Sequence, residues 1–470
     1  MKNDLIGNNR VAIFGCGHIF KVYEDIIKTN FTIQVFIDND INNHDKMIEG
    51  CVCIFPREVH KYDIDLIILM SASYLEMKNQ LLNCGCDEKK IICYRDVLGL
   101  LCYSQKRYCS KVKYTTHKKK NNILIISNEL RYNGAPIVVY RTSRIAIQLG
   151  YDVTVAASEA DARIIEDFIN CGVDVIIQEN LKYAAEENLF WTKEYGVILV
   201  NTFVMGLCAT RISKHQKVLW WLHENSDVYP EMDFWYNQIR KEIVDDNIGI
   251  FAVSERAKEN FLRFFPTNKV IKPLVVGIED WRTDRDVHNK DGITFAIIGG
   301  MIPRKGHNVL LNAINKMRNI DKVNFIFIGE RTDDNYGKTI INGITRLNNS
   351  VIYGEITQEK IKKIYQEIDV VIVPSLEETF SMAAAEAMMM GKVCIVSDCC
   401  GISEYIKNGE NGLVFPSKDF YRLSYLMDWC IENNSERLKI GERARLTYEK
   451  YFSLQIFEKN LNKVLTNLEK

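Results

Sequence analysis

One stretch of this 470-residue sequence, residues 369–391, combines acidic side chains with an apolar segment. A β-branched run is followed by a loop that carries Glu378, and the pattern then predicts a helix from near Phe380 to Gly391. Apart from Glu386, that helix is apolar on every side, which is typical of a buried helix. Glu386 is therefore predicted to be a largely buried carboxylate.

A carboxylate buried in this way needs hydrogen-bond donors. Burying an unpaired charge is very costly, and burying even an unpaired hydroxyl costs ~1–3 kcal/mol. The predicted helix has no Lys or Arg of its own that would pair with Glu386. Two sources of donors remain open from the sequence: the two hydroxyls of a ribose, or a basic side chain from elsewhere in the fold.

The same segment favours the binding of an anion. Free N–H groups near Phe380 and Ser381, together with the helix dipole, stabilise an anion by ~0.3–1 kcal/mol per charge. Arg304 and Lys305 follow another predicted strand of the same sheet, so the two loops would clamp a diphosphate if they face one crevice. The alternative for this pair is an exposed basic loop. Glu378 would point past the phosphates, so the pattern predicts a nucleotide diphosphate with a hydroxyl-rich group attached, which is a nucleotide sugar.

The elements that must hold these residues belong to a repeated pattern. Short β-branched runs alternate with helical patterns, and this predicts an α/β fold of parallel sheets covered by helices. The pattern restarts twice along the chain. It predicts a small Rossmann-like domain at 1–115, a second α/β domain at 121–290 and a third at 291–470, with a basic linker after the first.

Two positions in the second predicted domain stand where ligands bind. Gly134 lies in a loop before a predicted helix that has Pro136 at its first position and Gly150 after its end. The missing side chain of Gly134 would let backbone N–H groups approach a ligand. His223 follows the predicted strand 218–222, and open α/β sheets bind ligands outside the carboxyl ends of their strands. The alternative for His223 is a half-buried imidazole with ordinary partners.

The first predicted domain carries an incomplete nucleotide-binding fingerprint. Gly15 and Gly17 follow the predicted strand 11–14, and Asp38 stands where an acidic side chain would bind a ribose diol. Phe20 occupies the position at which a third glycine would allow close packing of helix and strand. The alternative is a tight turn in a domain that binds no nucleotide.

With these residues in view, the sequence resembles the family 4 glycosyltransferases of the GT-B fold. The spacing Glu378-x7-Glu386 resembles the E-x7-E signature of that family. Residues 397–416 are similar to its downstream block, and residues 299–306 resemble its glycine-and-lysine phosphate loop. The resemblance covers 121–455 and leaves the first domain outside.

The resemblance implies two facing Rossmann-like domains with the active site between them. It implies a retaining, metal-independent transfer of a sugar from a nucleotide diphosphate sugar to a glycan or lipid-linked acceptor. No cofactor is expected beyond that donor. The implied setting is the synthesis of a surface polysaccharide or glycoconjugate, and the last helix of such proteins often crosses back onto the first of the two facing domains.

Residue roles follow from the resemblance by position. Glu386 would hold the ribose hydroxyls, and Glu378 would contact hydroxyls of the donor sugar. The backbone at Phe380 and Ser381 would lie close by. The family usually has glycine where this chain has Ser381, a change that keeps the backbone N–H.

The remaining implied roles concern the diphosphate and the acceptor. Arg304 and Lys305 would neutralise the diphosphate, and Gly134 would lie beside it from the other domain. The family often has Arg at the position of Gly300, so the clamp is assigned here to the basic pair. His223 would sit close to the donor sugar and the incoming acceptor. His223 and Glu378 are therefore the candidate catalytic residues.

Composition and charge restrict the partners. The chain has 60 basic and 61 acidic residues, a net charge of −1, whereas a dedicated nucleic-acid binder is usually clearly basic. No apolar run approaches the ~20 residues that span a bilayer. We therefore expect a cytoplasmic protein that binds no nucleic acid, with at most a peripheral contact at the inner face of the membrane.

Basic side chains are concentrated between positions 106 and 120, a stretch without any acidic residue. They are Lys106, Arg107, Lys111, Lys113, Lys118, Lys119 and Lys120. Two interpretations remain open: a solvated linker, or a patch that meets anionic lipid or a charged acceptor.

Two further functions compete with the transferase hypothesis. A non-catalytic GT-B scaffold would use its first domain to dock a partner, although the presence of Glu378, Glu386, Lys305 and His223 argues against lost activity. A bifunctional enzyme would use the first domain to bind a nucleotide such as NAD or to modify the donor. The sequence does not identify the base, the sugar or the acceptor.

Overall fold

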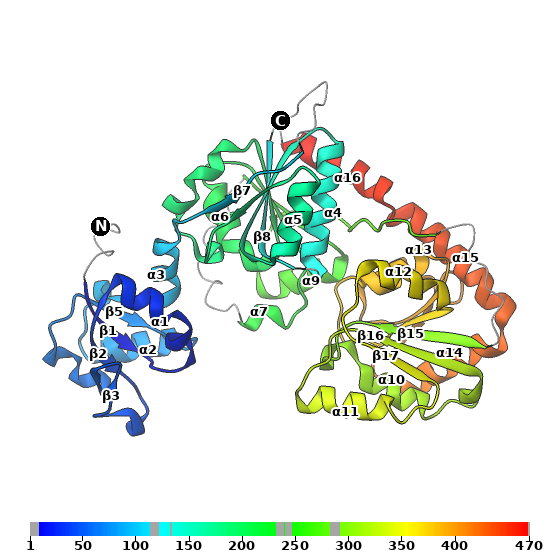
Figure 1. The fold of residues 1–470 in the computed structure, drawn as a ribbon, viewed down its shortest axis with the longest axis horizontal. Helices are drawn as coiled ribbons and strands as arrows, with labels where there is room; N and C mark the ends of the chain where they lie inside the picture. The colour runs from blue at the N-terminus through cyan, green and yellow to red at the C-terminus, as the bar shows by residue number, and fades with distance from the viewer. Residues whose placement is uncertain are drawn as a thin grey trace.

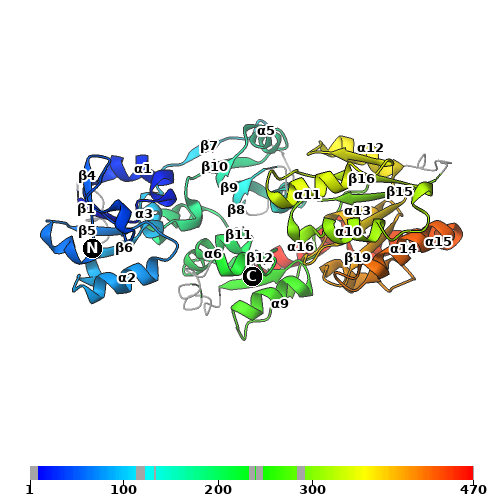
Figure 2. The ribbon, with the colours of Figure 1, turned by 90° about the horizontal axis from the view of Figure 1, so that it is seen from below.

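A computed structural model describes residues 9–112, 122–131, 134–231, 239, 247–282 and 292–468. Their strands form three sheets, which Figure 1 shows in a row, in the order of the chain. Figure 2 keeps the same order from a second direction. All described strand pairs are parallel except β3–β4 and β7–β10, and helices connect the parallel strands. The predicted α/β fold class is confirmed.

The first sheet has the strand order β3-β4-β2-β1-β5-β6. Its strands are β1 (Arg10–Phe14), β2 (Thr32–Ile37), β3 (Met47–Ile48), β4 (Cys51–Ile54), β5 (Leu66–Leu69) and β6 (Ile91–Cys93). Its helices are α1 (His18–Asn30), α2 (Tyr74–Asn83) and α3 (Tyr94–Leu101).

The second sheet has the strand order β14-β13-β12-β11-β8-β9-β10-β7. Its strands are β7 (Lys106–Tyr108), β8 (Asn122–Leu130), β9 (Asp152–Ala160), β10 (Asp174–Ile177), β11 (Val197–Asn201), β12 (Val218–Leu222), β13 (Ile248–Ala252) and β14 (Lys272–Pro273). Its described helices are α4 (Gly134–Gln148), α5 (Ala162–Asn170), α6 (Gly206–Ser213), α7 (Val228–Glu231) and α9 (Glu255–Phe264).

The third sheet has the strand order β17-β16-β15-β18-β19-β20. Its strands are β15 (Ile293–Ile298), β16 (Val323–Ile328), β17 (Ser350–Tyr353), β18 (Val370–Val373), β19 (Val393–Ser397) and β20 (Leu413–Phe415). The helices that follow in sequence are α10 (His307–Ile314), α11 (Asn335–Ile344), α12 (Gln358–Glu367), α13 (Met382–Met389), α14 (Phe420–Glu432), α15 (Asn434–Tyr451) and α16 (Leu454–Leu468).

The structure corrects two details of the sequence prediction. Residues 106–108, assigned above to the first domain and its linker, form β7 and pair antiparallel with β10 at the edge of the second sheet. Gly134, placed above in a loop, is the first residue of α4, so Pro136 is the third helical residue and not the first. The Lys/Arg positions at 113 and 118–120 lie outside the described residues.

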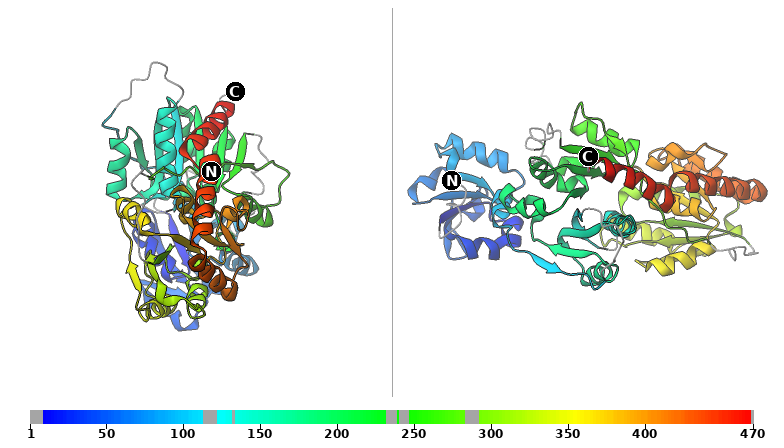
Figure 3. Two further views of the ribbon diagram at one scale, coloured as in Figure 1. Left: turned by 90° about the vertical axis from the view of Figure 1, so that its right-hand side faces the viewer. Right: turned by 90° about the horizontal axis from the view of Figure 1, so that it is seen from above.

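The last helix, α16, ties the second and third sheets together. Figure 3 shows α15 and α16 running as one long rod from the third sheet back to the second. Phe457 of α16 stacks on Trp221 of β12 with ring centroids 5.8 Å apart. A Cβ on Gly277, in the segment between the two sheets, would come within 2.8 Å of the Phe457 side chain, so only glycine allows this close approach. The segment between the two sheets and α16 therefore pack closely against each other.

The first domain is docked on the second by buried polar contacts. The side-chain amide of Gln178 donates to the carbonyl of Cys102 at 2.7 Å. Asn188 donates to the carbonyls of Gly99 and Leu100 at the end of α3, at 2.9 and 3.0 Å. These contacts satisfy backbone groups at a helix end, where carbonyls lack partners within the helix. Within the described ranges, none of the helices combines the length and apolar character of a membrane span.

Candidate functional site

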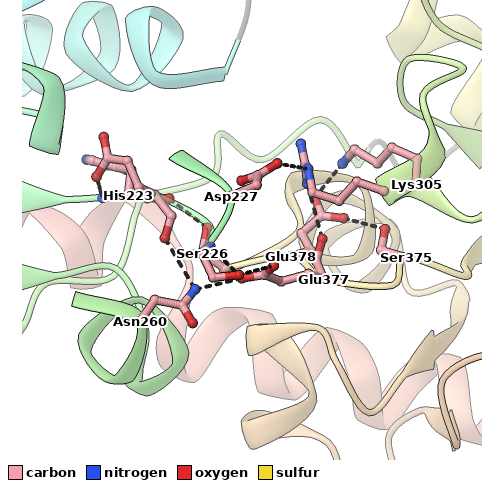
Figure 4. Close-up of polar contacts among 11 residues, drawn as sticks. His223, Ser226, Asp227, Asn260, Lys305, Ser375, Glu377 and Glu378 are labelled. Carbon is pink, nitrogen blue, oxygen red and sulfur yellow. Dashed lines mark hydrogen bonds and ion pairs between the residues drawn. The ribbon is translucent and has the colours of Figure 1, made fainter. Parts of the chain in front are cut away.

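The candidate residues come together where the second and third sheets face each other (Figure 4). His223 directly follows β12, and Glu378 lies in the loop after β18. Lys305 ends the short turn Pro303–Lys305 that follows β15. All three therefore lie beyond the carboxyl ends of parallel strands, where α/β sheets bind ligands.

A half-buried ion pair joins the two loops of the third sheet. Lys305 Nζ lies 2.6 Å from Glu378 Oε1, and the Ser375 hydroxyl donates to Glu378 Oε2 at 2.7 Å. Burial alone would raise the pKa of Glu378, but the Lys305 ammonium and the Ser375 hydroxyl outweigh it and hold the pKa below its ordinary value. Gly306 makes this approach possible, because it has φ +69° and a Cβ there would lie 2.0 Å from the carbonyl oxygen of Pro374.

Glu386 is a nearly buried carboxylate, as predicted, with 9% of its surface exposed. The Tyr365 hydroxyl donates to Glu386 Oε2 at 3.0 Å. Burial raises the pKa of Glu386 to about 7, while the positive charge of Arg141 and the Tyr365 hydrogen bond act in the opposite direction. Among the described residues, Tyr365 is the one hydrogen-bond donor to this carboxylate, which leaves acceptor capacity for a ligand.

His223 presents a neutral imidazole to the region between the sheets. Burial lowers the pKa of His223 to about 3. Its Nε2 is shielded from solvent and has no hydrogen-bond partner within the part of the chain that the structure describes. The ring lies against Trp221, with centroids 4.6 Å apart. An imidazole in this state can hydrogen-bond a hydroxyl but carries no charge.

Glu224 is a structural neighbour of His223. It is 8% exposed, and its two oxygens accept from the backbone N–H groups of Phe203 at 2.7 Å and His223 at 2.9 Å. Burial raises the pKa of Glu224 to about 7, against the effect of those N–H donors. Both oxygens are used by backbone, so Glu224 fixes the loop that carries His223.

Arg304 lies between the two facing domains. Its Nη1 donates to the carbonyl oxygen of Glu377 at 3.1 Å, and its Nε lies 3.7 Å from Asp227 Oδ2 of the opposite domain. Lys305 contacts the carboxylate of the next residue, Glu378. Both side chains of the basic pair are thus partly covered, at 25% and 20% exposed, and contact the 377–378 loop.

The start of α13 is held in a strained conformation. Ser381 caps the helix with φ +94°, a backbone region that favours glycine, and its hydroxyl accepts from Ala384 N at 3.4 Å. Phe380 is 5% exposed and packs edge-on against Phe452, with centroids 5.3 Å apart. The serine keeps the backbone N–H, as the sequence suggests, but it adopts a backbone conformation that favours glycine.

No described contact joins the remaining predicted residues to this cluster. Gly134 starts α4, and a Cβ there would meet nothing within 4 Å. In the first domain, Gly15 has φ +98° and Gly17 caps α1. Asp38 accepts from the Cys16 thiol at 2.7 Å, so its carboxylate already has a partner within the turn. No described contact joins these first-domain residues to the site in Figure 4.

Sequence reasoning missed three residues of this site. Arg141 reaches the region from α4 of the second domain, is 9% exposed, and donates to the Gly277 carbonyl at 3.4 Å. Tyr365 comes from α12, and Glu377 precedes the predicted Glu378. A basic residue in an otherwise apolar stretch of the predicted helix was the available signal for Arg141. No pattern in the sequence pointed to Tyr365 or Glu377, because their partners are distant along the chain.

Solved structures share the fold of the second and third domains. The structure of HepE from Anabaena in complex with UDP-glucose has a TM-score of 0.64 and is 18% identical. The match covers 74% of this chain and 100% of that chain. At this identity the likeness concerns the fold.

Two family models match consecutive parts of the chain. The model described as Glycosyl-transferase family 4 matches residues 119–277, and the model described as Glycosyl transferases group 1 matches residues 280–447. The chain belongs to the GT-B glycosyltransferases. The resemblance drawn from the motifs is thereby confirmed. A third model, described as C2185-like, N-terminal, matches residues 7–92 of this glycosyltransferase.

Curated relatives of the glycosyltransferase match in part. An uncharacterized glycosyltransferase of Methanocaldococcus jannaschii is 26% identical over 233 residues, which are 46% of this chain and 60% of the relative. The N,N'-diacetylbacillosaminyl-diphospho-undecaprenol alpha-1,3-N-acetylgalactosaminyltransferase of Campylobacter jejuni is 29% identical over 151 residues, 32% of this chain and 39% of the relative. The chain thus spans less than two thirds of the length of either relative.

Replacing Ser381 by glycine should relieve the strain at the start of α13. We expect Ser381→Gly to raise the free energy of unfolding of the third domain by about 1 kcal/mol, because glycine adopts this φ freely and the lost cap bond is long. Denaturant titration measures the change. Ser381→Ala is the matched control: it keeps the Cβ, loses the cap and should unfold more easily than wild type. A glycine variant no more stable than the alanine variant would contradict the strain.

Proposed function

We propose that the protein transfers a sugar from a nucleotide diphosphate sugar to a glycan or lipid-linked acceptor, with retention of configuration at the anomeric carbon and without a metal ion. The observation that carries the proposal is Glu386. It is a carboxylate 9% exposed, with one hydrogen-bond donor among the described residues. The two hydroxyls of a ribose would meet its remaining acceptor capacity, as the E-x7-E resemblance implies.

The basic pair supports a diphosphate as the leaving group. Arg304 and Lys305 end at the same crevice as the strained N-terminus of α13, whose free N–H groups and dipole favour an anion. A diphosphate bound there would compete with Glu378 for the Lys305 ammonium. Two side-chain cations and a helix N-terminus would offset the charge of a departing nucleotide diphosphate, the task that a metal ion performs elsewhere.

The roles of Glu378 and His223 follow from their charge. Lys305 and Ser375 keep Glu378 ionised, so it would accept hydrogen bonds from hydroxyls of the donor sugar. His223 is neutral, so its unpartnered Nε2 would hydrogen-bond a hydroxyl of the donor sugar or the acceptor. In the reaction, the bond between the anomeric carbon and the phosphate oxygen breaks and its electron pair leaves with the diphosphate. The acceptor oxygen bonds to the carbon, and its hydroxyl proton passes to the departing phosphate oxygen.

Several buried polar atoms near His223 have no partner among the described residues. Asn201, the last residue of β11, is fully buried, and neither amide atom has a partner within the described residues. The Thr202 hydroxyl and Asn225 Oδ1 are in the same state. These atoms lie at the carboxyl edge of the second sheet, next to the strand that leads to His223. The Campylobacter jejuni relative, whose name specifies a diphospho-undecaprenol-linked molecule, suggests a lipid-linked glycan.

The donor-binding role of Glu386 is tested by the affinity for UDP-glucose, GDP-glucose and ADP-glucose. A donor at 100 times its dissociation constant stabilises the protein by ~2.7 kcal/mol, which thermal unfolding detects. Glu386→Gln removes the negative charge and should weaken binding of the selected donor, while turnover by wild type should persist in EDTA. Failure of all three donors to stabilise wild type would contradict the proposal.

The same measurement has a predicted pH dependence. The pKa of Glu386 is raised to about 7, so below that pH the empty site holds a proton. Ribose hydroxyls that donate to the carboxylate favour its ionised form, so binding releases the proton, and affinity should rise about tenfold from pH 6 to pH 8. A nucleotide sugar has no phosphate group that titrates in this range. Glu386→Gln should show a flat profile, and equal profiles for both proteins would remove Glu386 from the donor site.

We further propose that the β7 edge contacts an anionic membrane surface. Lys106, Arg107 and Tyr108 are exposed there, and Lys111 and Val112 follow with exposed side chains. Each basic residue near an anionic surface contributes ~1 kcal/mol. Replacing Lys106, Arg107 and Lys111 by Gln should reduce co-sedimentation with phosphatidylserine vesicles and leave binding to neutral vesicles unchanged. Equal sedimentation of the two proteins with anionic vesicles would refute the contact.

A further inference from the structure

The loop that carries Glu378 has an extended backbone. Glu378 forms a parallel bridge with Cys400: its N–H donates to the carbonyl of Cys399 at 3.1 Å, and its carbonyl accepts from Gly401 N at 2.8 Å. In an extended chain, successive side chains point to opposite sides. Glu378 accordingly stays with Lys305 in its own domain, whereas its two sequence neighbours reach the opposite domain.

Both neighbours of Glu378 hold the loop that begins with His223. The carboxylate of Glu377 accepts from the backbone N–H of Ser226 at 2.6 Å and from its hydroxyl at 2.7 Å (Figure 4). It also accepts from Asn260 Nδ2 of α9 at 2.9 Å. The Thr379 hydroxyl donates to the carbonyl oxygen of His223 at 2.7 Å. Residues 223–226 are thus fixed at both ends by the residues on either side of Glu378.

These bonds join two domains, so they exist only while the domains are close together. Three donors meet one carboxylate, and hydrogen bonds to an ionised acceptor are stronger than neutral ones. Moving the two domains apart would separate Glu377 from Ser226 and Asn260, and bringing them together would restore the contact. In the closed state the three bonds fix the backbone position of His223 relative to Glu378.

We propose that Glu377 is a positioning residue for sugar transfer: domain closure, completed by its bonds to Ser226 and Asn260, sets His223 against the donor sugar that Glu378 holds. The inference rests on the proposed function for its catalytic consequence, while the closure itself is independent of it. The role belongs to the side chain, because Arg304 contacts only the backbone carbonyl of Glu377 and that contact survives a side-chain change.

Closure is tested on the free protein by small-angle X-ray scattering. Glu377→Gln keeps the size of the side chain and one acceptor oxygen but removes the negative charge, so the bonds from Ser226 and Asn260 lose the extra strength that an ionised acceptor gives them. It should increase the radius of gyration relative to wild type. Glu404→Gln is the matched control, because Glu404 also bridges the domains, to Glu255 N at 3.3 Å and Arg256 N at 3.1 Å, and contacts neither flank of Glu378. An unchanged radius of gyration in Glu377→Gln would overturn the closure.

Positioning is tested by turnover of UDP-, GDP- and ADP-glucose, measured as nucleotide diphosphate released. Glu377→Gln should lower kcat by about 10- to 100-fold and leave the dissociation constant of the donor within about threefold. Ser226→Ala should lower kcat in wild type but add little in the Glu377→Gln background, since the two side chains share one interaction. Glu404→Gln should have the smaller effect on kcat.

The outcomes distinguish failure of the positioning role of Glu377 from failure of the proposed sugar transfer. A Glu377→Gln enzyme with wild-type kcat would overturn the positioning role and leave the proposed function standing. A loss confined to donor affinity would overturn it as well, because it would place Glu377 in the donor site. If wild type releases no nucleotide diphosphate from any of the three donors, the proposed function fails and takes the positioning role with it, while scattering still decides whether Glu377 closes the domains.

Discussion

Two carboxylates where the domains meet, the half-buried Glu378 and the buried Glu386, determine much of the site around them. A carboxylate removed from water must be paired or hydrogen-bonded, and the two carboxylates have different partners. Glu378 has an ammonium and a hydroxyl within 2.7 Å and is held in the ionised form. Glu386 has one phenol, and burial raises its pKa to about 7. Glu378 is ionised and can accept hydrogen bonds from a ligand. The ionised form of Glu386 would be stabilised by a ligand that donates hydrogen bonds to it. A nucleotide sugar offers hydroxyls at both ends of its diphosphate.

The scaffold brings these groups together through contacts between distant parts of the chain. Because Gly306 has no side chain, its backbone packs closely against Pro374, and this brings Lys305 to the loop of Glu378. The α16 helix returns to the second sheet and stacks on Trp221, two residues before His223. Buried amides dock the first domain on the far side of the second sheet from the third, so all three bodies are joined by specific packing (Figure 1).

The fold class and the family could be predicted from the sequence because they depend on local patterns. Parallel strands were visible as β-branched runs, and Glu386 as a charge in an apolar helix. What could not be predicted depends on partners remote in the chain. The pairing of β7 with the second sheet, the Tyr365 bond to Glu386, and the bridge from Glu377 to Ser226 each join segments separated by many residues. The conformation of Ser381 was hidden for another reason, since serine seldom adopts φ +94° and the residue type gave no sign of it.

The most direct test is a crystal structure of the protein with a nucleotide sugar bound, beginning with UDP-glucose. The ribose hydroxyls should lie within hydrogen-bond distance of the Glu386 carboxylate, the diphosphate should lie between Lys305 and the N-terminus of α13, and the sugar hydroxyls should contact Glu378. A nucleotide bound away from Glu386, for example at Asp38 in the first domain, would contradict the assignment of the donor site to the third domain.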